Sequence, residues 1–356
     1  MFLSIIIVLI FLSVLILAHE LGHFLTAKKF GLLVEEFGFG LPPRIWGKKI
    51  GETIYSINAL PFGGFVKIFG EDGDAEQHGT DADSRGNRSF LNLSLWRRAI
   101  IIFAGVFMNF LLGWFLISII FSIGIPQALI ITEIRPESPA AKAGIKNGDK
   151  ILGIESGSGP LATELNSRNF TEFVKNNQGR EVSLKIKRAG EEINFKLIPR
   201  VNPLAGEGFI GVGLADAGIP KKNIAESMWE SLKASLFIIK AVFLGIISLI
   251  IKALSGKAGF EQVSGPVGIV KITAEAGGMG FIYLLQLLSL ISLNLAVINI
   301  FPFPALDGGR LLFLLIEKIK GSPLPPKFER YANSFGIILL LSLMALITIK
   351  DVIKLF

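Results

Sequence analysis

The sequence contains no cysteine. Disulfide bonds, thiolate catalysis and cysteine metal ligands are therefore excluded, so any metal ion would be held by His, Asp, Glu or carbonyl oxygen. Charged residues are also few, at 18% of the 356 residues, whereas hydrophobic residues make up 51%. This balance excludes both a simple cytosolic enzyme and a disordered chain.

Apolar residues are concentrated in blocks long enough to cross a bilayer, with polar stretches between them. They predict a polytopic α-helical membrane protein with about four transmembrane helices, from Phe2 to Ala18, Ala99 to Ile123, Tyr283 to Phe301 and Phe335 to Ile349. A cleavable signal peptide is the alternative for the first block. No basic residue precedes that block and no good cleavage site follows it, which favours a retained span.

Lysine and arginine flank the apolar blocks, and the formal net charge is +7. This placement suits membrane topology and anionic lipid better than nucleic acid, which we do not expect as a partner. The basic segment 32–95 is therefore assigned to the cytoplasmic side. Within it, Ile54 to Ile68 alternates weakly and is interrupted by Pro61 and by Gly63 and Gly64, as in a β-hairpin with a tight bend.

The region 126–216 carries frequent charges, and its segments Glu181 to Lys187 and Glu192 to Leu197 alternate as strands do. We therefore expect a folded aqueous domain beyond the second span.

The apolar stretch from Leu232 to Leu254 contains three lysines, and its role is open between a span and an interfacial or re-entrant helix. The second interpretation is preferred, because it keeps Asp307 at the same level as His19.

Two of the three histidines lie in the segment His19-Glu20-Leu21-Gly22-His23. A helix places positions i and i+4 on one face, so both imidazoles can bind one metal ion while Glu20 sits beside them. This is the H-E-x-x-H pattern of zinc proteases. Ionisable groups at the end of an apolar helix are costly in lipid, which favours a functional site over a histidine pair that merely faces the membrane surface.

A tetrahedral zinc ion with two histidine ligands needs a third protein ligand. Asp307 is the best candidate, because it follows the helix breaker Pro302-Phe303-Pro304 and precedes two glycines, where backbone can bend at membrane depth. The spacing equally permits Asp307 to be the N-cap of a helix from Arg310 to Ile319. His78 lies in the polar loop from Asp72 to Asn87 and is expected to be solvated.

Four segments together resemble a known family. His19 to His23 and Asn299 to Gly308 (NIFPFPALDG) look like the two signatures of the site-2 protease family of intramembrane zinc metalloproteases. Pro139 to Leu152 is similar to a PDZ domain, and Ser264 to Ile269 resembles the segment before that family's third span. The match covers nearly the whole chain in order and is closest to the bacterial RseP branch. It divides the chain at 1–31, 32–95, 96–125, 126–216, 217–280, 281–320 and 321–356.

The resemblance implies that His19, His23 and Asp307 are ligands of Zn²⁺ and that Glu20 is the catalytic base. The physical argument agrees, because zinc lowers the pKa of a coordinated water to about 7 and Glu20 can accept its proton. Asn299 corresponds to a substrate-contacting asparagine of the family. Hydrogen bonding between spans is the alternative role for that side chain.

The family is thought to present an unwound substrate span on a membrane-associated β-hairpin, which here would be Glu36 to Phe69. The substrate-contacting residues of the hairpin would be Gly63, Gly64 and Phe65. The single extracytoplasmic PDZ-like domain is expected to be circularly permuted, and its peptide-binding loop would contain Phe209, Ile210 and Gly211. An ordinary small β domain is the alternative.

Two departures from the family are visible. The chain has room for one PDZ domain, whereas many RseP proteins have two in tandem, so regulation is expected to be simpler. In the segment Ala104 to Asn109, Val106 stands where the family usually has proline. This departure weakens any role for Asn109 but leaves the expected zinc site unaffected.

The expected function is a monomeric zinc-dependent intramembrane endopeptidase of the bacterial inner membrane. The substrates that the resemblance implies are single-pass membrane proteins, such as anti-sigma factors and remnant signal peptides, with extracytoplasmic peptides bound by the PDZ-like domain. A non-catalytic PDZ receptor or chaperone is the main alternative, although it would not need Glu20 between two histidines. A metal or ion transporter is the second alternative, and it would favour paired repeats, which the sequence does not show.

Overall fold

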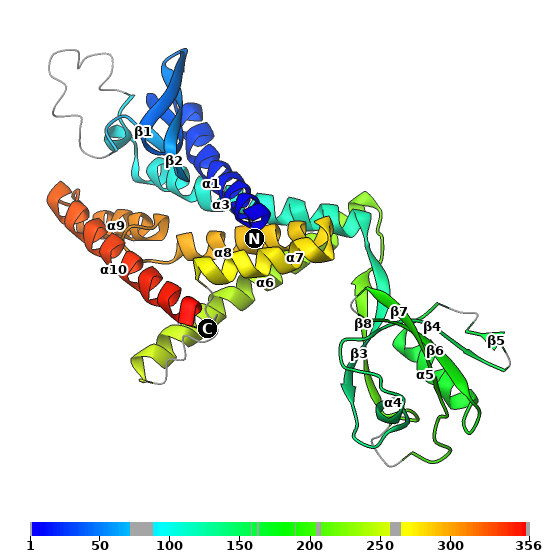
Figure 1. Ribbon diagram of the computed structural model, residues 1–356. Helices are drawn as coiled ribbons and strands as arrows, with labels where there is room; N and C mark the ends of the chain where they lie inside the picture. The colour runs from blue at the N-terminus through cyan, green and yellow to red at the C-terminus, as the bar shows by residue number, and fades with distance from the viewer. Residues whose placement is uncertain are drawn as a thin grey trace. The chain divides into compact units, whose positions relative to one another are not determined.

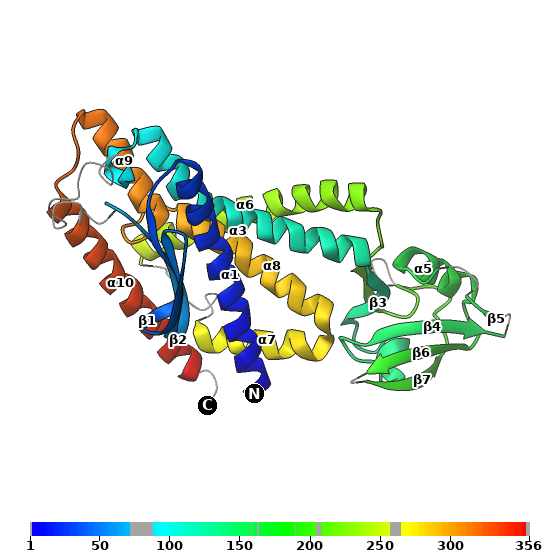
Figure 2. The same ribbon diagram turned by 90° about the horizontal axis from the view of Figure 1, so that it is seen from above.

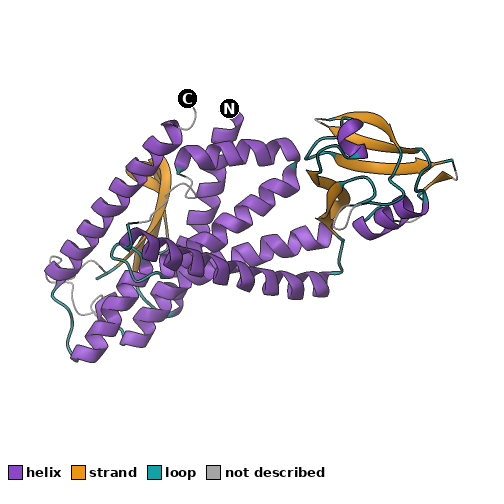
Figure 3. Cartoon of the chain, turned by 90° about the horizontal axis from the view of Figure 1, so that it is seen from below, coloured by secondary structure: helices purple, strands orange, loops and turns teal. Residues whose placement is uncertain are grey.

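The computed structural model describes residues 2–71, 88–157, 159–161, 164–188, 190–203, 208–256 and 265–353. The expected loop from Asp72 to Asn87, with His78, and Ser264 lie outside these residues. The chain divides into two compact units, residues 1–120 with 224–356 and residues 121–223. We call them the helical unit and the sheet unit. Figure 3 shows the secondary structure of each.

Five helices of the helical unit are long and apolar enough to cross a membrane. They are α1 (Phe2–Lys29), α3 (Leu95–Ile123), α6 (Ile224–Leu254), α8 (Phe281–Ile300) and α10 (Pro326–Ile353). The four predicted blocks lie in α1, α3, α8 and α10. The expected total of four is not confirmed, because α6, which we assigned to the interface, meets the same length and apolarity criteria.

The side chains of α6 that face α3 are small and polar. Ser231 of α6 lies with its Oγ 2.6 Å from Ser118 Oγ of α3, and Trp114 Nε1 donates to the Met228 carbonyl oxygen at 2.9 Å. Small residues let helices approach closely, and hydroxyl groups supply contacts between them. The amino-terminal part of α6 is therefore packed on α3, while most of its remaining apolar surface is exposed.

Two shorter helices complete the unit, α7 (Pro266–Met279) and α9 (Asp307–Lys320), with the 3₁₀ turn η3 (Phe90–Asn92). α7 and α8 are joined at Gly280, whose φ of 125° turns the chain, and Figures 1 and 2 show the two helices leading away from this junction. α8 thus runs back at an angle to α7. An α6 long enough to span the membrane is therefore compatible with Asp307 beside His19. The reason is that α8 runs back from the end of α7 and brings the chain toward the histidines.

Close packing between α1 and α3 depends on a glycine within the histidine segment. A Cβ atom at Gly22 would lie 2.3 Å from the Ala104 carbonyl oxygen and 2.8 Å from Met108 Cγ. Any larger residue would push the two helices apart. Ile101 and Ile102 of α3 are buried in the same apolar cluster as Ala27 of α1.

The hairpin of the helical unit consists of β1 (Val34–Ile50) and β2 (Thr53–Ile68), paired antiparallel with several register shifts. The turn between β1 and β2 lies at Gly51 and Glu52. β2 also changes direction within its length, because 54–57 runs parallel to 36–39 whereas 64–67 runs antiparallel to it. The chain therefore bends between Ile57 and Gly64, where Gly63 has a φ of 103°, and this confirms the predicted bend at Pro61 to Gly64. Residues 36–39 pair with 64–67 on one side and with 54–57 on the other. Among the described residues, 64–67 is therefore an edge segment.

The sheet unit is a sheet with strand order β7-β6-β4-β3-β8, in which neighbouring strands are antiparallel and β5 pairs with β4. The strands are β3 (Ile125–Ile134), β4 (Lys150–Ser156), β5 (Gly159–Pro160), β6 (Val182–Arg188), β7 (Glu191–Leu197) and β8 (Val212–Ile219), with helices α4 (Pro139–Lys142) and α5 (Ser167–Asn176). β6 and β7 confirm the two predicted strands. The core contains Leu129, Phe170, Leu184 and Ile186, all within this unit.

Candidate metal centre

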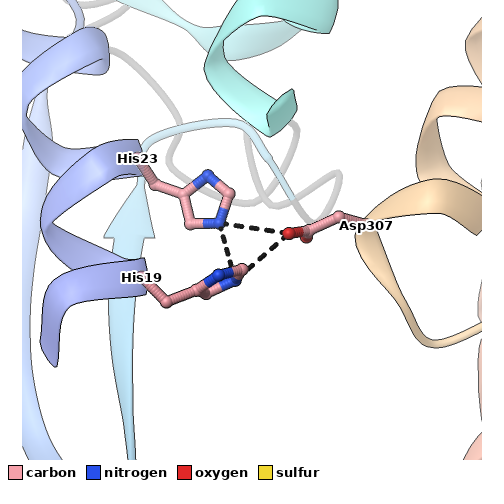
Figure 4. Close-up of side chains that lie close together, drawn as sticks. All are labelled: His19, His23 and Asp307. Carbon is pink, nitrogen blue, oxygen red and sulfur yellow. Dashed lines mark hydrogen bonds and ion pairs between the residues drawn. The ribbon is translucent and has the colours of Figure 1, made fainter. Parts of the chain in front are cut away.

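His19 and His23 lie one turn apart on α1, as the spacing predicts, and their rings meet edge to face with centroids 4.8 Å apart. The Nε2 atoms of the two imidazoles are separated by 3.2 Å. Figure 4 shows that both rings point toward Asp307, which comes from the start of α9. The sequence therefore brings together two nitrogens from one helix and a carboxylate from a distant one.

Asp307 reaches the histidines because the backbone after α8 folds tightly. The chain leaves α8 at Phe301, and α9 begins at Asp307 after the Pro-Phe-Pro segment. A Cβ atom at Gly308 would lie 2.2 Å from the Phe301 carbonyl oxygen. Only glycine fits this close approach of α9 to the end of α8. The N-cap position is Leu306, so the alternative of Asp307 as a capping residue is wrong.

The three side chains have the separations that a zinc ion requires. Asp307 Oδ2 lies 3.1 Å from His19 Nε2 and 3.5 Å from His23 Nε2. Tetrahedral zinc, with bonds of about 2.0–2.1 Å, holds neighbouring ligand atoms about 3.3 Å apart. Asp307 Oδ2 is also buried and has no hydrogen-bond donor among the described residues. A buried, unsatisfied carboxylate oxygen beside two imidazole nitrogens fits a cation.

The imidazole of His23 is oriented by the backbone of α3. Its Nδ1 atom lies 2.8 Å from the Ile101 carbonyl oxygen. Because a carbonyl oxygen only accepts, Nδ1 carries the proton and the lone pair of Nε2 is directed at the cluster. Space for both rings comes from Gly105, where a Cβ atom would lie 2.3 Å from His23 Nε2 and 2.8 Å from His19 Cε1.

Glu20 lies beside the cluster, within electrostatic range of both histidines and Asp307. The edge segment of β2 runs past it, because a Cβ atom at Gly64 would lie 3.4 Å from Glu20 Cγ and 3.1 Å from Ile16 Cγ2. Gly64 pairs with Phe39 of β1 on its other side. An acidic side chain, the three candidate ligands and an extended segment thus meet at one place.

Two ion pairs hold α9, the helix that carries Asp307. Arg98 Nη2 of α3 lies 2.9 Å from Glu317 Oε2, and both side chains are buried. Arg310 Nη2 lies 2.5 Å from Glu71 Oε1, just after β2. Sequence reasoning missed these residues. Charged residues within or next to apolar helices are the signal that could have singled out Arg98.

The remaining predicted residues are not among the three side chains that form this cluster. Asn299 is half-buried in the last turn of α8. Gly63 and Phe65 flank Gly64 in β2. Phe209, Ile210 and Gly211 form the segment just before β8 in the sheet unit. Ile210 is buried in the core there and Phe209 packs against that core, so neither is a freely exposed side chain. These six residues, and Gly64, stay predictions as substrate contacts.

The sequence matches the model of peptidase family M50 over residues 7–343. A Clostridium perfringens protein named as a candidate zinc metalloprotease is 35% identical over 352 residues, which cover 98% of each chain. A Nostoc protein with the same description is 36% identical over 97% of this chain and 94% of the relative. The zinc metalloprotease RasP of Geobacillus kaustophilus is 29% identical over 99% of this chain and 98% of the relative. The chain therefore belongs to peptidase family M50, the site-2 proteases, and is a multi-pass membrane zinc metalloprotease.

Proposed function

We propose that the protein is an intramembrane endopeptidase that hydrolyses the transmembrane segments of single-pass membrane proteins, with His19, His23 and Asp307 as its zinc ligands. The observation that carries this proposal is the meeting of two imidazole nitrogens and an unsatisfied carboxylate oxygen within 3.5 Å of one another, next to Glu20. His19 and His23 lie on α1, which is long and apolar enough to cross a membrane. Asp307 begins the helix that follows α8, which meets the same criteria. The bond to be cleaved would therefore be a peptide bond at membrane depth.

Glu20 is the residue we assign to proton transfer. Zinc bound by the three ligands would acidify a water molecule and polarise the peptide carbonyl. Glu20 takes the proton of the attacking water and then delivers it to the leaving nitrogen, as general base and then general acid. Its place between the two histidines on α1 keeps the carboxylate near the reacting atoms.

The edge segment 64–67 of β2 is the surface we assign to substrate. A transmembrane helix protects its carbonyl groups by internal hydrogen bonds, so it must be unwound before hydrolysis. An extended segment can then pair with an exposed strand edge through main-chain hydrogen bonds, which require little of the side chains. Gly64 supports this role, because its lack of a side chain leaves the strand close to Glu20. Asn299 is kept as a second substrate contact.

The sheet unit is proposed to bind extracytoplasmic peptides as a PDZ-like domain. A cavity of about 660 Å³ lies between α5 and the edge strand β8, and Thr171, Lys175, Val212 and Leu214 are among its lining residues. Addition of a peptide strand to β8 in this cavity would be the PDZ mode of recognition. The loop with Phe209, Ile210 and Gly211 would contribute main-chain groups at the start of β8.

We place the protein in the bacterial inner membrane as a monomer, with substrates such as anti-sigma factors and remnant signal peptides. A non-catalytic receptor that uses the sheet unit alone is the rival. The proposal is tested by incubating the full-length protein in detergent with a model single-pass substrate and mapping the products by mass spectrometry. Cleavage within the span that stops on chelation and returns with zinc is expected. Cleavage confined to the aqueous part of the substrate, or unaffected by chelation, would contradict the proposal.

A further inference from the structure

Asn109 of α3 is a buried amide with one unsatisfied atom. The residue is 1% exposed, and its Oδ1 atom has no hydrogen-bond partner among the described residues. Its Nδ2 atom lies 3.4 Å from His19 Nδ1. A buried amide oxygen without a donor costs free energy, so a polar side chain at this place in an apolar helix calls for a functional explanation.

The nitrogen of His19 that Asn109 faces is the one turned away from the proposed metal. His19 directs Nε2 at Asp307, and Nδ1 is the remaining ring nitrogen. A neutral imidazole that binds a metal through Nε2 carries its proton on Nδ1, which then donates a hydrogen bond. An amide nitrogen cannot accept that bond. Rotation of the amide by half a turn places Oδ1 against His19 Nδ1, and both atoms are then satisfied.

We propose that Asn109 is the positioning residue for His19, accepting a hydrogen bond from Nδ1 so that Nε2 is held as a zinc ligand. The inference rests on the proposed zinc site. His23 already has the equivalent acceptor in the Ile101 carbonyl oxygen, 2.8 Å from its Nδ1. Among the contacts of the described residues, Asn109 is the side chain that faces His19 Nδ1. If it were removed, His23 would keep its acceptor and His19 would have none among these contacts.

The surroundings of Asn109 fit this task. Ile101, Gly105 and Asn109 follow one another at intervals of four residues on α3, as His19 and His23 do on α1. One face of α3 thus supplies an acceptor for His23, space for both rings and an acceptor for His19. The main chain at Asn109 is itself fixed, because Ser292 Oγ of α8 donates to its carbonyl oxygen at 2.7 Å. The backbone that carries the Asn109 side chain is therefore held by a second helix.

Three variants of the full-length protein test the inference. Asn109→Leu keeps the approximate size of the side chain and removes the acceptor, whereas Asn109→Asp keeps an acceptor. Ser118→Ala is the matched control, since it removes another buried hydrogen-bonding group of α3, the one paired with Ser231. Zinc affinity of each purified protein is measured in detergent by competition with a chromophoric chelator. The visible spectrum of the cobalt-substituted protein reports the ligand geometry, and thermal midpoints of the zinc-free proteins report folding.

Loss of an outer hydrogen-bond partner typically weakens metal binding 10- to 100-fold. We expect the zinc affinity of Asn109→Leu to fall by a factor in that range and its cobalt spectrum to be altered. The zinc affinity of Asn109→Asp should be near that of the wild type, and that of Ser118→Ala should be unchanged. Wild-type affinity in Asn109→Leu, or equal losses in Asn109→Leu and Asn109→Asp, would overturn the inference. If Asn109→Leu does not fold, Asn109→Ala takes its place with the same expectation. A wild-type protein that binds no zinc would instead contradict the metal centre itself.

Discussion

Arg98 and Glu317, 219 residues apart in the sequence, form a buried ion pair with Nη2 and Oε2 separated by 2.9 Å. Arg98 lies in the first turn of α3, and Glu317 lies on α9, the helix that begins with Asp307. Glu317 also accepts a hydrogen bond from the Leu324 main chain through Oε1, at 3.0 Å. The pair therefore connects the helix that packs against the histidines to the helix that carries the third candidate ligand.

Substitution of one partner of this pair is expected to be costly. Arg98→Ala would leave Glu317 charged and buried, which typically lowers the free energy of unfolding by about 3–5 kcal/mol. The Asp307 carboxylate would also lose its fixed position, so zinc affinity should fall. Denaturant titrations in detergent measure the first effect and chelator competition measures the second.

The double variant with Arg98→Met and Glu317→Leu is the control for this prediction. Replacing both charges by apolar groups of similar size removes the unpaired charge, so much of the stability should return. Equal stability of Arg98→Ala and the wild type would show that the pair does not hold α9.

Gly105→Ala is expected to disturb the histidines directly. The added methyl group would lie 2.3 Å from His23 Nε2, so the rings must move. Overpacking of this kind costs about 1–3 kcal/mol, and a loss of 1.4 kcal/mol in binding is tenfold in affinity. We expect zinc to bind at least about tenfold more weakly, as measured by chelator competition.

Gly245→Ala is the matched control, because a Cβ atom at this position of α6 would meet nothing within 4 Å. It makes the same chemical change in another apolar helix and should leave zinc affinity unaltered. Equal affinities of Gly105→Ala and Gly245→Ala would refute the idea that Gly105 makes room for the ligands.

The sheet unit is expected to lose stability in acid through Asp149. Two hydrogen bonds from the Arg188 guanidinium, at 2.7 Å each, hold the pKa of the Asp149 carboxyl below its usual range, against the opposing effect of burial. A carboxyl with a lowered pKa in the folded state contributes stability above its unfolded pKa of about 3.9, and that contribution disappears as the pH falls.

Hydrogen exchange of residues 121–223 in the full-length protein measures this dependence between about pH 5 and pH 2.5. The protection of the core strands should decrease as the pH falls below about 4. Asn at position 149 cannot titrate, so Asp149→Asn should be less protected at pH 5 and show a weaker pH dependence. An identical pH dependence in both proteins would rule out Asp149 as its source.

Much of the fold follows from local sequence. Apolar blocks of sufficient length predicted α1, α3, α8 and α10. The prediction is possible because an apolar segment in lipid must satisfy its own backbone hydrogen bonds, which a helix does. The spacing of His19 and His23 needs only a helix to become a pair of adjacent ligands. Asp307 could be singled out since few carboxylates lie beside a helix breaker at membrane depth.

Other features depend on contacts between distant segments, which local patterns do not encode. Hydropathy alone did not settle whether α6 lies in the interface or crosses the membrane, and the helix meets the length and apolarity of a span. The pair Gly63 and Gly64 indicated the bend in β2, but the sequence did not show that the segment after this bend passes close to Glu20. Likewise, the residues around Asn109 in the sequence do not predict that His19 lies beside it in space.

Zinc content and cleavage of a model single-pass substrate, measured side by side for wild type, Glu20→Gln and Asp307→Ala in detergent, test the central claim most directly. We expect the wild type to bind about one zinc ion and to cleave the substrate. Glu20→Gln should keep the same zinc content, while its rate of cleavage falls by at least about 10²-fold, because general acid–base catalysis contributes 10²–10⁴-fold. Asp307→Ala should lose both metal and activity. Full cleavage by Glu20→Gln, or full zinc content in Asp307→Ala, would contradict the roles assigned to these residues.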